Sequence, residues 1–131
     1  MYRNSLLWRI IYIIWPPFIR LFEFIGFHKG RQPHAVGFLK PGVSLDEARR
    51  FLESKGYEHC ILAWRDAGEI LGHRLVHRKV FQYHVRIFKD GEVRAHYEYS
   101  LEGNPIKHVL ETVLDAETPY FKTLLGPILK S

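Results

Sequence analysis

The chain has 131 residues, 47% of them hydrophobic and 15% aromatic, which suffices for one folded domain with a core and excludes a disordered chain. Its formal net charge of +5 lies entirely within residues 1–43, which hold six basic residues and one acidic residue. The remaining residues balance 13 basic against 13 acidic side chains, so they do not indicate a general polyanion binder, and nucleic acid is not the favoured partner.

Residues 1–27 form a hydrophobic segment that is apolar around almost its whole circumference. A surface helix of a soluble protein shows a polar face, but residues 5–27 include only three charged side chains, those of Arg9, Arg20 and Glu23. The pair Pro16-Pro17 predicts a break into two helices, because proline lacks the amide hydrogen that continues a helix. Each half is then too short to span about 30 Å of hydrocarbon.

The flanks of this segment favour a monotopic or re-entrant membrane anchor. Basic residues lie at both ends, and since positive charge favours the cytoplasmic side, symmetric flanks suit a segment that lies in the interface or enters and returns. We expect its aromatic rings to contact the membrane: Trp8, Tyr12, Trp15, Phe18 and Phe22. A kinked transmembrane helix, or a helical pair packed on the domain or in an oligomer interface, are the alternatives.

Residues 28–43 are typical of a basic linker, with two prolines, three glycines and no acidic residue. A helix is predicted to begin at the capping box Ser44-Leu45-Asp46-Glu47 and to end at Gly56. We therefore place the domain boundary near Val43 and expect one α+β domain over residues 44–131.

Two strands are expected next, over residues 58–65 and 69–77, with the turn Asp66-Ala67-Gly68 between them. Cys60 lies in the apolar run of the first strand, and we interpret it as a small buried hydrophobe and not as a nucleophile. Because it is the only cysteine, it forms no internal disulfide, which fits a cytosolic setting.

Residues 80–100 predict a β-hairpin. Residues alternate between two faces from Phe81 to Ile87 and again from Glu92 to Ser100. The loop Lys89-Asp90-Gly91 suits a type I turn closed by a bulge, with Gly91 at positive φ. With this three-residue loop, apolar residues pair with apolar residues on one face and polar residues pair with polar residues on the other. A two-residue loop would place apolar and polar residues opposite each other on both faces. One face then carries four apolar or aromatic pairs: Phe81/Tyr99, Tyr83/Tyr97, Val85/Ala95 and Ile87/Val93.

The other face carries the candidate chemistry, in the pairs Gln82/Glu98, His84/His96 and Arg86/Arg94. Like charges directly opposed destabilise a sheet, so the two arginines require an anion. Acidic side chains of a neighbouring strand or helix are one alternative, and a bound phosphate, carboxylate or nucleotide is a second. A third is a metal ion held by His84, His96 and Glu98. The linear spacing matches no standard metal signature, and we expect no cofactor.

After the hairpin, Asn104-Pro105 predicts a helix whose apolar stripe extends to Leu114, and Thr118-Pro119 predicts another that Gly126-Pro127 interrupts. Both are expected to cover the aromatic face of the sheet. The predicted fold class is α+β, a four-stranded antiparallel meander sheet with helices on one face, preceded by the hydrophobic N-terminal helical segment. The Arg/His face is expected to be open or dimerised.

These features favour a small membrane-associated binding module on the cytoplasmic side. Its open sheet face would bind a phosphorylated headgroup, a nucleotide or an acidic protein surface through four side chains: Gln82, Arg74, Arg86 and Arg94. The alternative is a small phosphoesterase in which His84 or His96 is the general acid or base and the arginines stabilise phosphoryl charge. No triad, carboxylate pair or nucleophile elbow supports an enzyme, so the sequence leaves that question open.

Overall fold

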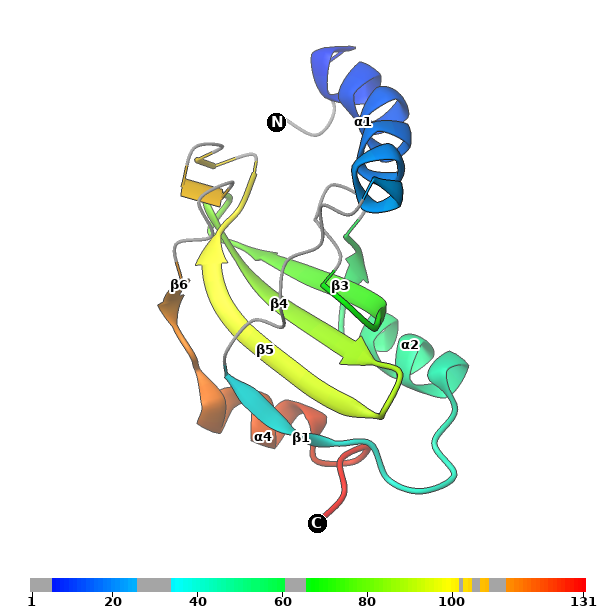
Figure 1. The fold of residues 1–131 in the computed structure, drawn as a ribbon. Coiled ribbons are helices and arrows are strands. Elements are labelled where there is room, and N and C mark those ends of the chain that lie inside the picture. The colour runs from blue at the N-terminus through cyan, green and yellow to red at the C-terminus, as the bar shows by residue number, and fades with distance from the viewer. Residues whose placement is uncertain (1–5, 26–33, 61–65, 102, 105–106, 109–112) are drawn as a thin grey trace.

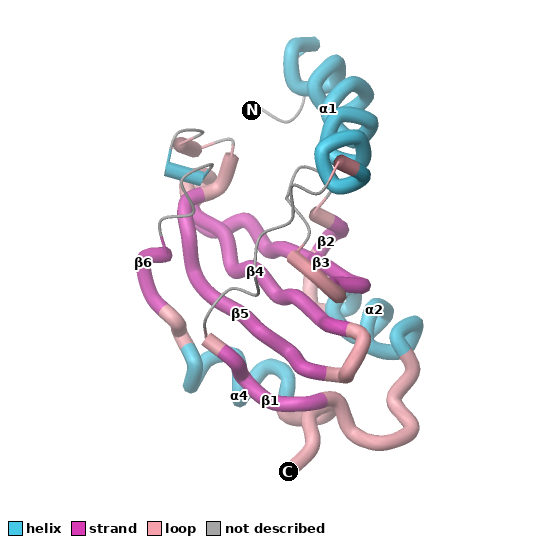
Figure 2. Tube along the Cα trace, in the orientation of Figure 1, coloured by secondary structure: helices cyan, strands magenta, loops and turns pink. Residues whose placement is uncertain are grey.

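The chain has an α+β fold in the computed structural model, which describes residues 6–25, 34–60, 66–101, 103–104, 107–108 and 113–131. Figures 1 and 2 show a curved sheet with helices on one side. The helices are α1 (Leu6–Phe24), α2 (Leu45–Ser54) and α4 (Thr118–Leu125). The strands are β1 (Ala35–Phe38), β2 (Glu58–His59), β3 (Glu69–His77), β4 (Phe81–Phe88), β5 (Glu92–Tyr99) and β6 (Val113–Asp115).

The central hairpin has the predicted register. Strands β4 and β5 are antiparallel and pair Phe81 with Tyr99, His84 with His96 and Arg86 with Arg94. Gly91 closes the turn at φ 86°, and its amide donates to the carbonyl oxygen of Phe88 at 2.9 Å. The bulged turn therefore sends alternate side chains of both strands to the same faces, as the alternation predicted.

The sheet is larger than the predicted four-stranded meander. Its strand order is β1-β5-β4-β3-β2, and β6 also pairs with β5, so the sheet has six strands. The prediction missed β1 and β6, which both lie along the outer edge of β5 (Figure 2). Strand β1 corrects the expected linker of residues 28–43, because Ala35–Phe38 pairs with β5 and Val36 belongs to the core.

The two helices α2 and α4 cover one face of the sheet, as expected (Figure 1). Ser44 caps α2 by accepting a hydrogen bond from the amide of Glu47 at 3.1 Å. Leu52 of α2 and Phe121 of α4 are fully buried against the apolar face of the hairpin. The predicted pairs Val85/Ala95 and Ile87/Val93 lie at the centre of this core, where each side chain is at most 1% exposed.

The predicted helix from Asn104 to Leu114 is confirmed only in part. Oδ1 of Asn104 accepts a hydrogen bond from the amide of Lys107 at 3.1 Å, and Lys107 and His108 are helical. Val113 and Leu114 belong to strand β6, whose Val113 pairs with Glu98. The prediction assigned these apolar side chains to a helical stripe from their spacing alone. They form a strand instead because the edge of β5 offers backbone hydrogen-bonding groups with which an extended segment can pair. The stripe positions Ile106, Val109 and Leu110 lie outside the described residues. The next predicted helix is confirmed as α4, which begins at Thr118 and ends before Gly126.

The N-terminal segment forms one helix and not two. Helix α1 continues through Pro16-Pro17, where a break was predicted. Proline at these positions removes two amide donors, and the prediction was wrong to treat that loss as sufficient to end the helix. Figure 1 shows α1 standing beyond the sheet. In the part of the chain that the structure describes, no helix is both long enough and apolar enough to cross a membrane.

The turn glycine gives a direct test of the hairpin register. Gly91→Ala should lower the free energy of unfolding by about 1–2 kcal/mol, because a side chain at positive φ is strained. Gly37→Ala is the matched control, since its added Cβ would meet only Leu129 methyl groups at 3.8 Å, an ordinary contact. Urea denaturation measures both. Equal effects of the two substitutions would contradict the strain argument.

Candidate functional site

The sheet face opposite the helices carries a buried cluster of polar side chains. Because neighbouring strands pair in register, the cluster draws on β3, β4 and β5 and consists of Arg74, Gln82, His84, Arg86, His96 and Glu98, here called the polar cluster. Each member is at most 4% exposed, so the expected open face is wrong. The alternation predicted which residues share this face, but alternation alone carries no information on what else covers it.

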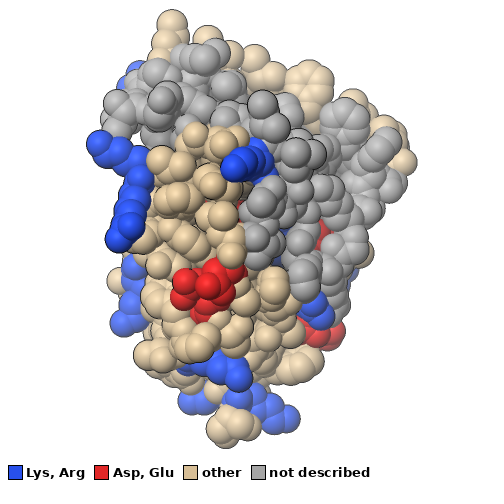
Figure 3. Space-filling view, turned by 90° about the vertical axis from the view of Figure 1, so that its left-hand side faces the viewer, with Lys and Arg blue, Asp and Glu red and all other residues tan. Residues whose placement is uncertain are grey.

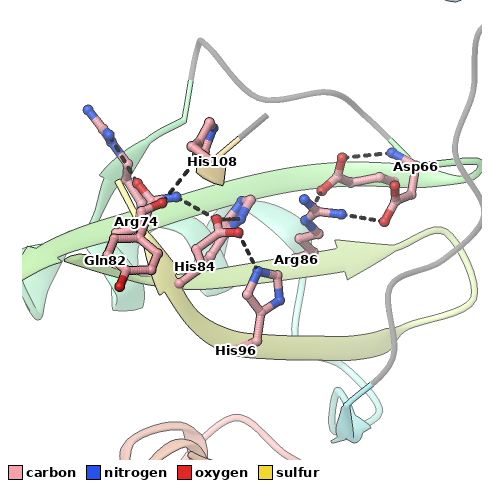
Figure 4. A network of polar contacts seen from close by, with 10 residues as sticks. Asp66, Arg74, Gln82, His84, Arg86, His96 and His108 are labelled. Carbon is pink, nitrogen blue, oxygen red and sulfur yellow. Dashed lines mark hydrogen bonds and ion pairs between the residues drawn. The ribbon is translucent and has the colours of Figure 1, made fainter. Parts of the chain in front are cut away.

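Glu98 is the centre of the polar cluster, because its carboxylate oxygens lie beside Gln82, His84 and His96, which Figure 4 labels. The amide of Gln82 donates to its Oε1 at 2.6 Å, and Nδ1 of His84 donates to the same oxygen at 3.1 Å. Nε2 of His96 lies 3.0 Å from Oε2. One carboxylate therefore links both imidazoles and the Gln82 side chain, and the cross-strand pairs place all four groups side by side.

The protonation states follow from these contacts. Burial alone would raise the pKa of Glu98, but the hydrogen bond from His84 and the close approach of the His96 imidazole hold it well below its usual range. For His84, burial and then the Arg86 charge lower the pKa to about 3, despite its hydrogen bond to Glu98. The cluster is thus an ionised carboxylate beside a neutral imidazole. With Nδ1 protonated, the buried Nε2 of His84 keeps its lone pair and has no hydrogen-bond partner.

The arginines have carboxylate partners within the chain. Arg86 forms an ion pair with Asp66, and its Nε lies 3.4 Å from Oε1 of Glu69. Arg94 pairs with Glu92, two residues away on the same strand. The first of the three alternatives for these opposed charges is therefore observed: acidic side chains of the fold itself neutralise them.

Arg74 lies at the other end of the polar cluster. Its guanidinium donates to Oε1 of Gln82 at 3.0 Å and lies 3.9 Å from Oε1 of Glu58. Through Gln82, Arg74 is connected to Glu98 and the two histidines. All four predicted anion-binding residues thus lie on one face, as expected, and three of them, Gln82, Arg74 and Arg86, are buried.

The sequence analysis missed Asp66 and Glu69 as members of the site. Both flank the tight turn before β3, where Gly68 has φ 83° and the amide of Glu69 donates to the carbonyl oxygen of Asp66. A bulge between Glu69 and Leu71 shifts the strand register, which is why the facing of this strand was ambiguous from alternation. The sequence did contain a signal for this pairing, because two acidic residues lie at a turn close in sequence to a hairpin that carries arginines.

A separate hollow of about 400 Å³ lies on the helix side of the sheet, between the start of α2 and strands β2 and β3. Its lining includes Leu45, His59, Leu71 and His73, and no member of the polar cluster. The histidines proposed for a phosphoesterase, His84 and His96, are at most 2% exposed. The observed geometry therefore does not present them in a concave surface, which the hydrolase hypothesis requires.

Cys60 also belongs to the polar side of the sheet. Its amide donates to the carbonyl oxygen of Gly72, which pairs with Arg86 on the next strand. Loss of solvation raises the pKa of its thiol to about 12. At neutral pH the sulfur is therefore protonated, which agrees with the expectation that Cys60 is not a nucleophile, although its side chain is partly and not fully buried.

No protein family, curated protein or solved structure was found to match this chain. Its function must therefore be argued from two features of its own geometry. One is the buried polar cluster, and the other is the exposed apolar surface of α1.

Arg86 and Arg94 give a matched test of the internal charge pairing. Arg86→Met should lower the free energy of unfolding by about 3–5 kcal/mol, because it leaves Asp66 and Glu69 buried without their cation. Arg94→Met should cost no more than about 1 kcal/mol, because that pair is partly solvated. Urea denaturation measures both variants. Equal losses would show that burial does not distinguish the two pairs.

His84 predicts an acid-sensitive fold. An unfolded histidine has a pKa near 6.5, whereas in the folded chain the His84 pKa is about 3. Between these values the unfolded chain binds a proton that the folded chain does not. The free energy of unfolding therefore falls as the pH drops below about 6.5, by up to about 1.4 kcal/mol per pH unit.

The variant His84→Gln isolates this effect, because glutamine keeps an amide donor for Glu98 and does not titrate. Urea denaturation between pH 7 and pH 4 should show a smaller loss of stability for the variant than for the wild type. Parallel losses would assign the acid sensitivity to other groups.

Proposed function

We propose that this protein is a non-catalytic module that associates with anionic membrane surfaces through α1. The observation that carries the proposal is the exposed apolar surface of that helix. Twelve large hydrophobic side chains are exposed in the described part of the chain, and eight of them lie between Leu6 and Ile25. Leu6 and Ile13 are each 75% exposed and Phe24 is 88% exposed. Clustering of this kind is typical of a surface that is covered by a partner or a membrane.

The exposed residues recur at helical spacing. Leu6, Ile10, Ile13, Ile14, Phe18, Leu21, Phe24 and Ile25 follow one another by one, three or four residues, which places them along one side of the helix. Phe18 is the one predicted membrane-contacting aromatic whose side chain is described. The side chains of Trp8, Tyr12, Trp15 and Phe22 lie outside the described residues.

Energetics favour a lipid surface for this stripe. Full burial of one large apolar side chain contributes about 1.5–3 kcal/mol. Even partial insertion of eight such groups would exceed the few kcal/mol that reversible surface binding requires. A helix that lies in the interface buries its apolar side and keeps charged side chains at the headgroups.

The basic residues of α1 supply the attraction for anionic lipid. Arg9 and Arg20 are both exposed, and residues 1–43 carry the entire net charge of the chain. Each basic residue near an anionic leaflet contributes about 1 kcal/mol. The proposed anionic partner is thus a lipid headgroup that meets α1. This differs from the ligand first expected at Arg86 and Arg94, whose charges are balanced by carboxylates of the chain.

The described side chains on the face shown in Figure 3 do not form a continuous basic stripe. Lys and Arg side chains lie in separate groups on the left, in the upper middle and at the bottom, and an acidic group lies near the middle. A nucleic-acid-binding face would gather basic side chains along a continuous stripe. The proposed contact with the membrane is therefore made by the N-terminal helix, which holds the α+β domain at the surface on the cytoplasmic side.

The test is vesicle flotation of the full-length protein with phosphatidylcholine vesicles that contain phosphatidylserine. The double variant Ile13→Glu, Phe24→Glu should bind at least about tenfold more weakly, because it places two charges in the inserted side. Leu114→Glu is the matched control, since Leu114 is also exposed but lies in β6. Equal binding by the wild type and the double variant would overturn the proposal.

The lipid's charge is tested separately with Arg9→Gln, Arg20→Gln. This variant should lose affinity for the anionic vesicles and keep its weaker binding to pure phosphatidylcholine. Should the apolar stripe serve self-association instead, light scattering without lipid would show an oligomer that the double variant Ile13→Glu, Phe24→Glu dissociates, and flotation would be weak for every variant.

A further inference from the structure

We propose that His84, His96 and Glu98 form a binding site for one divalent transition-metal ion. This site is independent of the membrane contact proposed for α1. Among the described residues, these three side chains are the group whose ligand atoms lie close enough to hold an ion, within 4.8 Å of one another. All three are buried, and they come from the two central strands of the sheet.

The donor set defines the class of metal. Two imidazole nitrogens and one carboxylate oxygen suit Zn²⁺, Fe²⁺ or Co²⁺, whereas Mg²⁺ and Ca²⁺ prefer oxygen ligands. Three protein ligands also leave at least one coordination position for water or another small molecule. The geometry therefore points to a transition-metal ion with an open position.

The distances need little adjustment for such an ion. In tetrahedral geometry, ligand atoms bound at about 2.0–2.2 Å to one ion lie roughly 3.3–3.6 Å apart. Glu98 already lies 3.1 Å from Nδ1 of His84 and 3.0 Å from Nε2 of His96. The two imidazoles, whose ring centroids are 5.5 Å apart, would have to approach each other, which requires side-chain rotation and no change of strand register.

A second observation points to a ligand in the polar cluster. Nε2 of His84 and Nε2 of His96 are buried nitrogens with no hydrogen bond of acceptable geometry, although His84 and His96 are 1% and 2% exposed. Buried polar atoms in folded proteins are nearly always satisfied, so two unsatisfied imidazole nitrogens in one cluster call for a ligand. For His96 the unsatisfied Nε2 is itself the nitrogen that would bind the ion. For His84 the proton would move from Nδ1 to Nε2, so that Nδ1, the nitrogen nearer to Glu98, offers its lone pair to the ion.

The space beside His84 is also kept open by the backbone. Gly72 pairs with Arg86 on the neighbouring strand, and a Cβ at Gly72 would lie 3.7 Å from Nε2 of His84 and 3.4 Å from Oε1 of Glu69. The absence of a side chain at Gly72 leaves this position beside the imidazole unfilled. A glycine within a strand often marks such a close approach.

The surrounding charges tolerate a cation. The positive charge of Arg86 acts on His84, but Arg86 pairs with both Asp66 and Glu69, so two carboxylates compensate its charge. Gln82 donates to Oε1 of Glu98 at 2.6 Å and is therefore a positioning residue that holds the carboxylate in place. Such outer contacts fix a ligand's orientation in metal sites.

The test begins with the full-length protein, freed of metal with a chelator and titrated with Zn²⁺ in a calorimeter and with Co²⁺ in a spectrophotometer. The wild type should bind one equivalent, and Co²⁺ should give visible bands of a nitrogen- and oxygen-ligated ion. His96→Gln and Glu98→Gln should abolish this binding. Gln82→Leu should weaken it by about 10- to 100-fold, because the carboxylate loses its support.

His59→Gln is the matched control, because His59 is exposed and lies on the opposite face of the sheet. Its metal binding should equal that of the wild type. Since buried substitutions can prevent folding, X-ray absorption of the wild-type zinc protein gives an independent measurement and should show two imidazole ligands. The proposal is overturned if the folded wild type binds no ion, if the zinc has no histidine ligand, or if His59→Gln loses as much affinity as His96→Gln.

Discussion

The register of the β4–β5 hairpin is the constraint on which the rest of the structure depends. The turn Lys89-Asp90-Gly91 decides that His84 faces His96 and that Glu98 lies one pair further along. A slip of one residue would move each of these side chains to the face that packs against α2 and α4. The turn conformation, in which Gly91 has φ 86°, therefore fixes both the apolar core and the polar cluster.

Burial of the polar side of the sheet is possible because its charges balance locally. Arg86 is matched by Asp66 and Glu69, and Glu98 collects hydrogen-bond donors instead of facing another carboxylate. Buried ion pairs contribute little net stability compared with a well-packed apolar core, but breaking one of them is costly. The chain retains buried charged groups at the centre of its sheet although they add little net stability. Such groups are more typical of a functional site than of a purely structural region.

The hairpin and the start of α2 were predictable from sequence, because residue alternation, loop length and helix capping depend on residues that are close together in the chain. The pairing of Phe81 with Tyr99 and of Arg86 with Arg94 followed from alternation and loop length, and the start of α2 followed from the Ser44 cap. Exposure was not predictable, because it depends on segments distant in sequence. The short strands β1 and β6 were missed for the same reason. Three or four residues are too few to show an alternating pattern, and these segments are strands because they pair with the edge of β5.

Strand β1 also has a mechanical role that follows from its place in the sheet. Its end is hydrogen-bonded on both sides, with the amide of Leu39 donating to Gly91 and that of Lys40 donating to Ile128. The amide of Lys130 donates a hydrogen bond to the carbonyl oxygen of Phe38, so the C-terminal residues are also bonded to the end of β1. Tension applied to the segment before β1 would first load Ala35, which pairs with Arg94 of β5, and only then Leu39 and Lys40. The central hairpin therefore carries part of any force that enters through the N-terminal segment.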